Sequence, residues 1–194
     1  IKTMIIVFGS LNVDMVLPVE TLPRPGNIVL CDEYKLLPGG KGANQAVAAA
    51  KAGAKVKMFG SIGNDSFAQI ARHFLETTNV DFSALTKSDR PTGCATICVD
   101  STGENMITIA SGANLEASSA TIPDELLTEK TTVLLQMEVP PEENWKLIER
   151  AKQKKARIIL NLAPAQPISD ELIQSLNVLV MNQIEATVLA LHLG

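Results

Sequence analysis

The feature of this sequence that most constrains its fold is a regular alternation of short apolar segments with longer amphipathic ones. The short segments have the length and apolar character of buried strands: 4–8, 56–60, 132–139, 157–162 and 177–181. The longer segments carry apolar residues at helical spacing: 39–52, 65–77, 141–155, 169–175 and 185–193. Strands that alternate with helices predict an α/β fold, in which helices cover both faces of a mostly parallel sheet.

Two stretches interrupt this alternation and predict a second, smaller sheet. Residues 28–37 alternate like a half-exposed strand, and 92–99 and 105–110 flank the turn-forming run Ser101–Glu104. These three strands have no helices between partners, so we expect a small antiparallel sheet set apart from the main one. A sheet of this size is marginally stable in water by itself, and we therefore expect it to cover a ligand or another subunit.

Composition and charge exclude several classes of protein. The 194 residues are 46% hydrophobic and 20% charged, which is typical of a globular protein. The net charge of −4 predicts no nucleic-acid partner, and apolar runs shorter than the ~18 residues of a membrane span predict no membrane partner. The three cysteines form no C-x-x-C pair, and the two histidines lack zinc-type spacing. We therefore expect a reducing, cytoplasmic setting.

Two polar residues follow the first predicted strand. Asn12 and Asp14 are two positions apart, so in an extended segment their side chains point to the same face. Open α/β sheets bind ligands at the carboxyl ends of their strands. A carboxylate beside an amide suits the neighbouring hydroxyl groups of a polyol. The alternative is an ordinary turn, because Asn and Asp are common in loops.

The glycine-rich run Pro38–Ala46, with the sequence PGGKGANQA, is the most distinctive local pattern. Its glycines lie where a helix is predicted to begin, and there they allow a ligand close to the backbone and expose amide donors to it. Lys41 and Asn44 are three residues apart and share one face of that helix. The run matches neither the Walker phosphate loop nor G-x-G-x-x-G. The alternative is a glycine-rich turn with a solvated lysine.

Further polar residues lie near predicted strand ends. Glu138 is close to the end of the strand predicted at 132–139, where it suits either a hydroxyl acceptor or a turn residue. Asn182 and Glu185 have the N-x-x-E spacing of a helix cap with a carboxylate at its third position. The same pair beside a helix N-terminus also suits a phosphate and a water held on Mg²⁺. The two roles are compatible.

Five motifs occur in an order that resembles the ribokinase family of carbohydrate kinases, the PfkB group. They are Gly9–Asp14 (GSLNVD), Leu22–Gly26 (LPRPG), Gly39–Ala46 (GGKGANQA), Gly60–Asp65 (GSIGND) and Asn182–Glu185 (NQIE). Each motif alone is weak, but five in this order are specific. The resemblance extends over essentially the whole chain.

The resemblance implies a fold and a set of site residues. The fold would be a three-layer α/β/α sandwich over 1–194, with a lid sheet from about 13–37 and 92–110. Six residues would bind sugar hydroxyls: Asn12, Asp14, Gly40, Lys41, Asn44 and Glu138. Three residues would line the apolar side of the lid, although ordinary strand packing is the alternative for them: Ala95, Ile97 and Ile109. Asn182 would approach the ATP phosphates, and Glu185 would belong to the network around Mg²⁺.

The activity implied by the resemblance is transfer of the ATP γ-phosphoryl group to a primary hydroxyl, O5 of D-ribose, which gives ribose 5-phosphate. ATP and Mg²⁺ would be needed, K⁺ would be a further cofactor, and the lid would join two subunits in a homodimer. The catalytic Asp of the family belongs to a later G-A-G-D motif, which is absent from these 194 residues. We therefore expect the catalytic base to lie beyond Gly194. The C-terminal part of the family fold would then be missing, and the 194 residues would be inactive by themselves.

Two alternatives stay open. The first is a kinase of the same family that acts on another sugar or on a nucleoside. A substrate panel would identify it, because buried polar groups reject analogues that lack a matching hydroxyl. The second is a non-catalytic fragment that binds sugar or dimerises, for which binding without ATP hydrolysis is expected.

Overall fold

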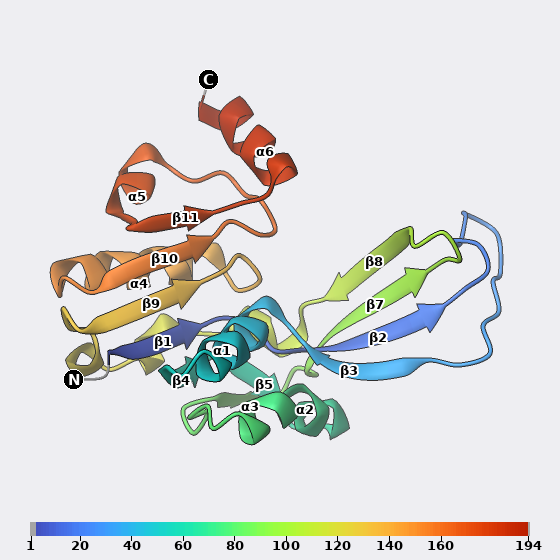
Figure 1. Cartoon of the computed structure of the whole chain (residues 1–194), viewed down its shortest axis with the longest axis horizontal. Helices are drawn as coiled ribbons and strands as arrows, with labels where there is room; N and C mark the ends of the chain where they lie inside the picture. The colour runs from blue at the N-terminus through green and yellow to red at the C-terminus, as the bar shows by residue number, and fades with distance from the viewer. Residues whose placement is uncertain (1–2, 194) are drawn as a thin grey trace.

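The main sheet contains all five strands that the apolar segments predict. The computed structural model describes residues 3–193. The strands are β1 Met4–Phe8, β4 Lys55–Phe59, β9 Thr131–Leu135, β10 Arg157–Asn161 and β11 Val178–Val180. They lie side by side in the order β11–β10–β9–β1–β4, and every pairing is parallel (Figure 1). Only β9 is clearly shorter than predicted, because the chain turns away after Leu135 toward Pro140 and Pro141, which are the N-cap and the first residue of the next helix.

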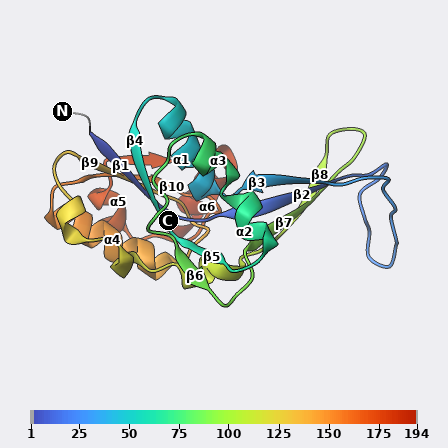
Figure 2. The ribbon, with the colours of Figure 1, turned by 90° about the horizontal axis from the view of Figure 1, so that it is seen from below.

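Helices cover both faces of this sheet. The described residues form α1 Lys41–Lys51, α2 Ser66–Ala71, α3 His73–Thr77, α4 Pro141–Gln153, α5 Asp170–Ser175 and α6 Gln183–Leu193. Figure 2 shows α1 and α4 on opposite sides of the strands. The single helix predicted over 65–77 is two short helices, since Arg72 interrupts it with φ −91° and ψ −3°. None of the described helices has the length and apolar character needed to cross a membrane.

The prediction for the catalytic base concerns the C-terminal end of the sequence. Gly194, beyond which we expect that base, lies outside the described residues. The structure therefore does not test this expectation, and the position of the base stays a prediction.

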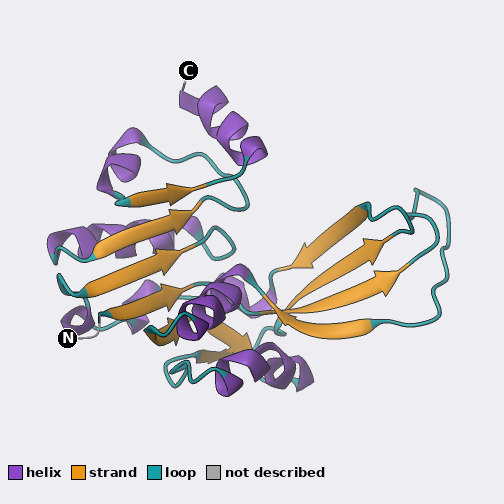
Figure 3. Cartoon of the chain, viewed as in Figure 1, coloured by secondary structure: helices purple, strands orange, loops and turns teal. Residues whose placement is uncertain are grey.

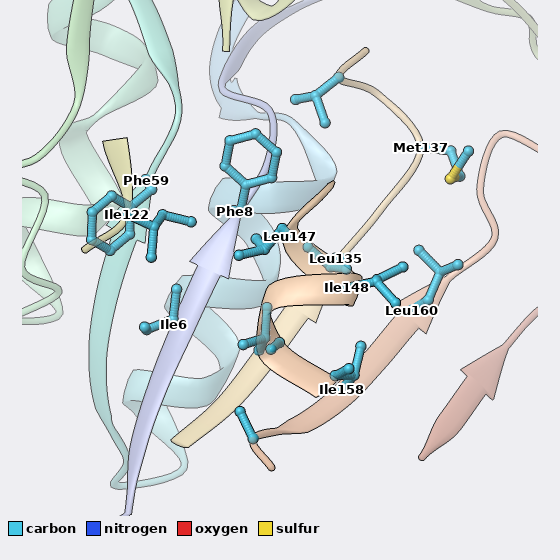
Figure 4. Packing of buried hydrophobic residues seen from close by; sticks show 14 of the residues in the cluster. Ile6, Phe8, Phe59, Ile122, Leu135, Met137, Leu147, Ile148, Ile158 and Leu160 are labelled. Atoms are coloured by element: carbon cyan, nitrogen blue, oxygen red, sulfur yellow. The ribbon is translucent and has the colours of Figure 1, made fainter. Parts of the chain in front are cut away.

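Side chains of β1 alternate between two hydrophobic cores. Ile6 and Phe8 pack in one core with Leu147 of α4 (Figure 4). Val7 lies between them in the sequence and packs in the other core with Ala46 of α1. A strand buried on both faces needs a continuous apolar run, and MIIVF supplies one.

A four-stranded lid sheet projects from one end of the main sheet, and Figure 3 shows its outer part as strands and loops alone. Its strands are β2 Asn12–Pro18, β3 Lys35–Gly39, β7 Gly93–Val99 and β8 Asn105–Ala110. The predicted hairpin of β7 and β8 is confirmed. The strand predicted at 28–37 is mostly wrong, because β3 begins only at Lys35. Residues 28–34 have no neighbouring strand, and Ile28 is 91% exposed there.

The pairing within the lid differs from a purely antiparallel sheet. β2 pairs antiparallel with β3, and β7 with β8, but β2 and β7 at the centre run parallel. Both central strands leave the main body in the same direction, so that Asn12 and Gly93 pair at their starts. A two-stranded sheet of β5 Ser61–Gly63 and β6 Thr86–Ser88 was not predicted, since three residues are too few to show a period.

Candidate functional site

The register of the lid sheet places five of the predicted residues on one face. Asp14 of β2 pairs with Ala95 of β7, and Ala95 pairs with Ile109 of β8. Asn12 and Ile97 are each two residues from a member of this row, so they share its face. The polar groups of this face lie on β2, and the apolar side chains lie on β7 and β8. Ala95 is buried, whereas Ile109 is 46% exposed.

The glycines before α1 allow two main-chain segments to meet. Gly40 caps the helix with φ 91°, and a Cβ there would lie 2.8 Å from the main-chain nitrogen of Asn12. A Cβ at Gly39 would overlap the carboxylate of Asp14. Residues with side chains would therefore push the start of α1 away from β2. This close approach brings the predicted helix start to the polar residues that follow β1.

Glu138 is fixed through one of its two carboxylate oxygens. Ser10 Oγ donates a hydrogen bond to Glu138 Oε2 at 2.6 Å, and the main-chain N–H of Lys41 donates to the same oxygen at 3.0 Å. Ser10 Oγ also accepts from the N–H of Gly42 at 3.2 Å. Glu138 Oε1 accepts no hydrogen bond within residues 3–193. The carboxylate is thus joined to the start of α1, and its second oxygen accepts no hydrogen bond from the described residues.

Asp14 is the electrostatically unusual group of this cluster. Burial raises the pKa of Asp14 above its ordinary value, the nearby carboxylate of Glu138 raises it further, and Lys41 lowers it. In the described part of the chain, no hydrogen bond reaches its carboxylate. Two carboxylates and one ammonium group therefore share this corner. Together they can accept protons from two hydroxyl groups and donate to a third group.

Asn114 is a residue that sequence reasoning missed. It lies in the 3₁₀ helix Gly112–Glu116, and its Nδ2 donates to Asn12 Oδ1 at 2.8 Å. Both residues are buried and, with Ile109 and Glu138, they line a cavity of about 260 Å³. The sequence offered little signal, because the helix is short, lacks a clear period and lies 102 positions from its partner.

Of the predicted site residues, Asn12, Ile109 and Glu138 line this cavity, and the others lie outside its lining. Asn44 is exposed on α1, one turn after Lys41. Asn182 and Glu185 form a reciprocal cap at the start of α6, in which Glu185 Oε2 accepts from Asn182 N at 2.7 Å and Asn182 Oδ1 accepts from Glu185 N at 2.8 Å. This confirms the capping interpretation. The pair follows β11, three strand spacings or about 14 Å from β1.

The residues at α6 fit a water-mediated contact to Mg²⁺ but no fuller metal site. Glu185 Oε1 has no partner among the described side chains, so one carboxylate oxygen is free. Mg²⁺ commonly keeps several waters and takes one or two carboxylates together with substrate phosphates. No cluster of three His, Cys, Asp or Glu suited to a metal occurs in residues 3–193.

Comparison with known proteins finds relatives among the ribokinases. The chain is 36% identical to the ribokinase of Haemophilus influenzae over 186 residues, which are 94% of the chain and 61% of that protein. It is 33% identical to the ribokinase of Bacillus subtilis over 187 residues, 95% of the chain and 64% of that protein. The chain thus spans about three fifths of the length of these relatives.

Solved structures and a family model give the same result. The fold matches the ribokinase of Thermotoga maritima with a TM-score of 0.85 and 36% identity, over 95% of this chain and 61% of that one. It matches Arabidopsis thaliana ribokinase, solved with ribose and ATP, with a TM-score of 0.83 and 29% identity, over 96% and 62%. The model for pfkB family carbohydrate kinases matches residues 2–194. With its α/β/α architecture and lid, the chain therefore belongs to the pfkB family of carbohydrate kinases.

Proposed function

We propose that this chain is the sugar-binding part of an ATP-dependent ribose kinase. The observation that carries the proposal is the cluster of Asp14, Lys41 and Glu138 at the carboxyl end of β1, below the polar part of the lid face. Two carboxylates and an ammonium group beside the amide of Asn12 suit a polyol, since each hydroxyl can donate to an oxygen and accept from a nitrogen. The similarity to two ribokinases supports ribose as the sugar.

In this proposal the chain acts by positioning the sugar. Phosphoryl transfer depends mostly on alignment and on stabilisation of charge. Asp14 and Glu138 would hold ribose hydroxyls so that O5 faces the start of α6, and the apolar lid residues would exclude water. When bound, ATP supplies the phosphoryl group and Mg²⁺ neutralises its charge. Asn182 would approach the phosphates, and the free oxygen of Glu185 would hold a water of the metal. We also propose K⁺ as a further cofactor.

The proton of O5 needs a base, and we propose the Asp of the family's G-A-G-D motif for this role, in sequence beyond Gly194. The 194 residues contain no such run. They are therefore expected to bind ribose without phosphorylating it. A turnover rate in the ordinary enzyme range, about 1–10³ s⁻¹, would contradict this expectation.

The lid is also proposed to join a second copy of the chain. β8 is an edge strand of the lid, and all its residues are exposed. Among them are Met106, Ile107 and Ile109, which are 45%, 51% and 46% exposed. A second lid would remove this apolar surface from water.

The three cysteines are free thiols, which supports the reducing cytoplasmic setting proposed for the protein.

Titration calorimetry with D-ribose, D-fructose and adenosine tests the choice of substrate. We expect ribose to bind most tightly, because a site built around specific hydroxyl groups leaves its polar groups unpaired with a poor analogue. Tighter binding of fructose or adenosine would assign the chain to another sugar or to a nucleoside. If none of the three binds, the proposed function is wrong.

A further inference from the structure

The main chain fixes the orientation of the Asn114 amide. The N–H of Leu11 donates to Asn114 Oδ1 at 2.9 Å, and Asn114 Nδ2 donates to the carbonyl oxygen of Leu11 at 3.2 Å. A main-chain N–H only donates and a carbonyl oxygen only accepts. The reversed amide would therefore set donor against donor and acceptor against acceptor. Asn114 is 1% exposed, so water does not relieve such a mismatch.

This orientation determines the orientation of Asn12. Asn114 Nδ2 uses its second proton to donate to Asn12 Oδ1 at 2.8 Å. Asn12 must accept at this contact and therefore keeps its own Nδ2 for another partner. Among residues 3–193, no atom accepts from Asn12 Nδ2. Asn12 lines the same cavity as Glu138, so a ligand there meets a donor beside an acceptor.

The start of β7 is shaped around this contact. A Cβ at Gly93 would overlap both Asn12 Oδ1 and Asn114 Nδ2. The 3₁₀ helix that carries Asn114 is held next to β7, since the N–H of Ala113 donates to the carbonyl of Pro91 at 2.7 Å. Three segments far apart in the sequence thus meet to form one amide pair.

We propose that Asn114 is a positioning residue that fixes Asn12 as a hydrogen-bond donor to the substrate. A hydroxyl group has one proton, and in this cavity Glu138 Oε1 is free to accept it. The hydroxyl oxygen then needs a donor, which Asn12 Nδ2 supplies. A reversed Asn12 amide would face that oxygen with another oxygen and weaken binding by about tenfold or more. The inference rests on the proposed function, because it takes this cavity as the sugar site.

Hydrogen exchange of the side-chain amides, followed by NMR without ligand, tests the fixed orientation. We expect slow exchange for the Asn114 amide protons and fast exchange for those of Asn12. In Asn114→Asp the carboxylate can only accept, so Asn12 must reverse and its protons become protected. Protected Asn12 protons in the unsubstituted chain would overturn the inference. So would Asn12 protons that stay unprotected in Asn114→Asp.

Ribose titration of variants tests the effect on binding. Asn12→Asp and Asn114→Asp both turn an acceptor toward the ligand, and each is expected to weaken ribose binding about tenfold or more. In Asn114→Ala the Asn12 amide can take either orientation and can still donate to the ligand, so this variant should lose less ribose affinity. Asn114→Ala removes all three hydrogen bonds of the side chain, whereas Asn114→Asp also turns an acceptor of Asn12 toward the ligand. A loss of ribose affinity in Asn114→Ala as large as in Asn114→Asp, or unchanged affinity in Asn12→Asp, would overturn the inference.

Two controls complete the experiment. Asn177→Asp adds the same charge at the far edge of the sheet and keeps the hydrogen bond from Ile158 N, so its ribose affinity should not change. Circular dichroism establishes that each variant is folded, and Asn12→Asp tests the same reversal if Asn114→Asp does not fold. If the unsubstituted chain binds no ribose, the proposed function fails, whereas the exchange experiment still decides the role of Asn114.

Discussion

Among single residues, Asp14 shows how a proposed binding group can oppose the stability of the fold. Burial and the carboxylate of Glu138 raise its pKa, and Lys41 only partly offsets them. The folded protein therefore holds the proton of Asp14 more tightly than the unfolded chain does. Between the ordinary pKa and the raised one, stability falls as the pH rises, and the loss is complete above the raised pKa. A ligand hydroxyl that donates to this carboxylate would relieve the cost.

Asp14→Asn is thus expected to stabilise the protein while it removes the proposed acceptor for a sugar hydroxyl. At pH 7 the variant should have a higher Tm than the unsubstituted chain, and this difference should vanish well below pH 4, where Asp14 is protonated in both the folded and the unfolded chain. Ribose affinity should fall by about tenfold or more. Thermal unfolding at several pH values and ribose titration measure the two effects. A lower Tm at pH 7 would contradict the electrostatic account.

Substitution of Ser10 is expected to lower both the stability of the fold and the affinity for ribose. Ser10→Ala removes the donor to Glu138 and leaves the buried N–H of Gly42 without its acceptor. We expect a loss of about 1–3 kcal/mol in the free energy of unfolding, measured with urea, and weaker ribose binding. Ser83→Ala is the matched control, because it removes a serine–carboxylate bond of 2.6 Å to Asp81 on an exposed loop. Equal ribose affinity in both variants would contradict the role given to Ser10.

At the scale of elements, the carboxylate of Asp65 connects α2 to the residue that precedes β7, where this lid strand leaves the main body. Asp65 caps α2 by accepting from Ala68 N at 3.0 Å, and it accepts from Thr92 N at 2.7 Å and from Thr92 Oγ1 at 2.8 Å. Thr92 directly precedes β7. Burial acts to raise the pKa of Asp65, but the hydrogen bonds from Thr92 and Ala68 outweigh burial and lower it. The ionised form therefore stabilises the fold.

Asp65→Ala should accordingly destabilise the protein in a pH-dependent way. A lost helix cap costs about 1–2 kcal/mol, so we expect at least this loss at pH 7. Because the folded pKa is lowered, the contribution is present above about pH 4 and is lost as the pH falls through the folded pKa. Urea unfolding at pH 7 and pH 3 measures the difference, with the exposed Asp89→Ala as control. A penalty that grows on acidification would refute this explanation.

The lid edge carries the prediction for assembly. Ile107→Asp places a charge in the apolar surface of β8 that we propose to be buried between two lids. We expect its dimer dissociation constant, measured by sedimentation equilibrium, to rise about tenfold or more. Asn105→Asp adds the same charge at the start of the same strand and should change association less. Unchanged association in Ile107→Asp would exclude this edge as the interface.

Across the whole molecule, the strands and helices that show a local apolar period could be predicted from the sequence. The pairing of strands that are far apart in the sequence could not. The apolar run Met4–Phe8 and the helical spacing in 141–155 reveal burial directly, so the main sheet and its helices follow from them. The parallel pairing of β2 with β7 depends on the path of the chain between them. Residues 28–34 alternate like a strand but lack a neighbour to pair with.

The same division holds for the candidate site. Asp14 could be selected because it follows a predicted strand, Glu138 because it lies near the end of one, and Lys41 because it lies at the start of a predicted helix. The structure brings the three together. Asn114 could not be selected, since what distinguishes it is its hydrogen bonds with Leu11 and Asn12, which are more than one hundred positions away in the sequence. The chemical role of each of these residues stays a prediction until ligand binding is measured.

The central claim is that one cluster at the carboxyl end of β1 forms a ribose site within these 194 residues. Titration calorimetry of the chain and of Asp14→Ala with D-ribose tests it most directly. We predict saturable binding of one ribose per chain and no detectable heat of binding for Asp14→Ala, with both proteins folded by circular dichroism. Equal ribose affinity in the two proteins, or no binding to the unsubstituted chain, would contradict the claim.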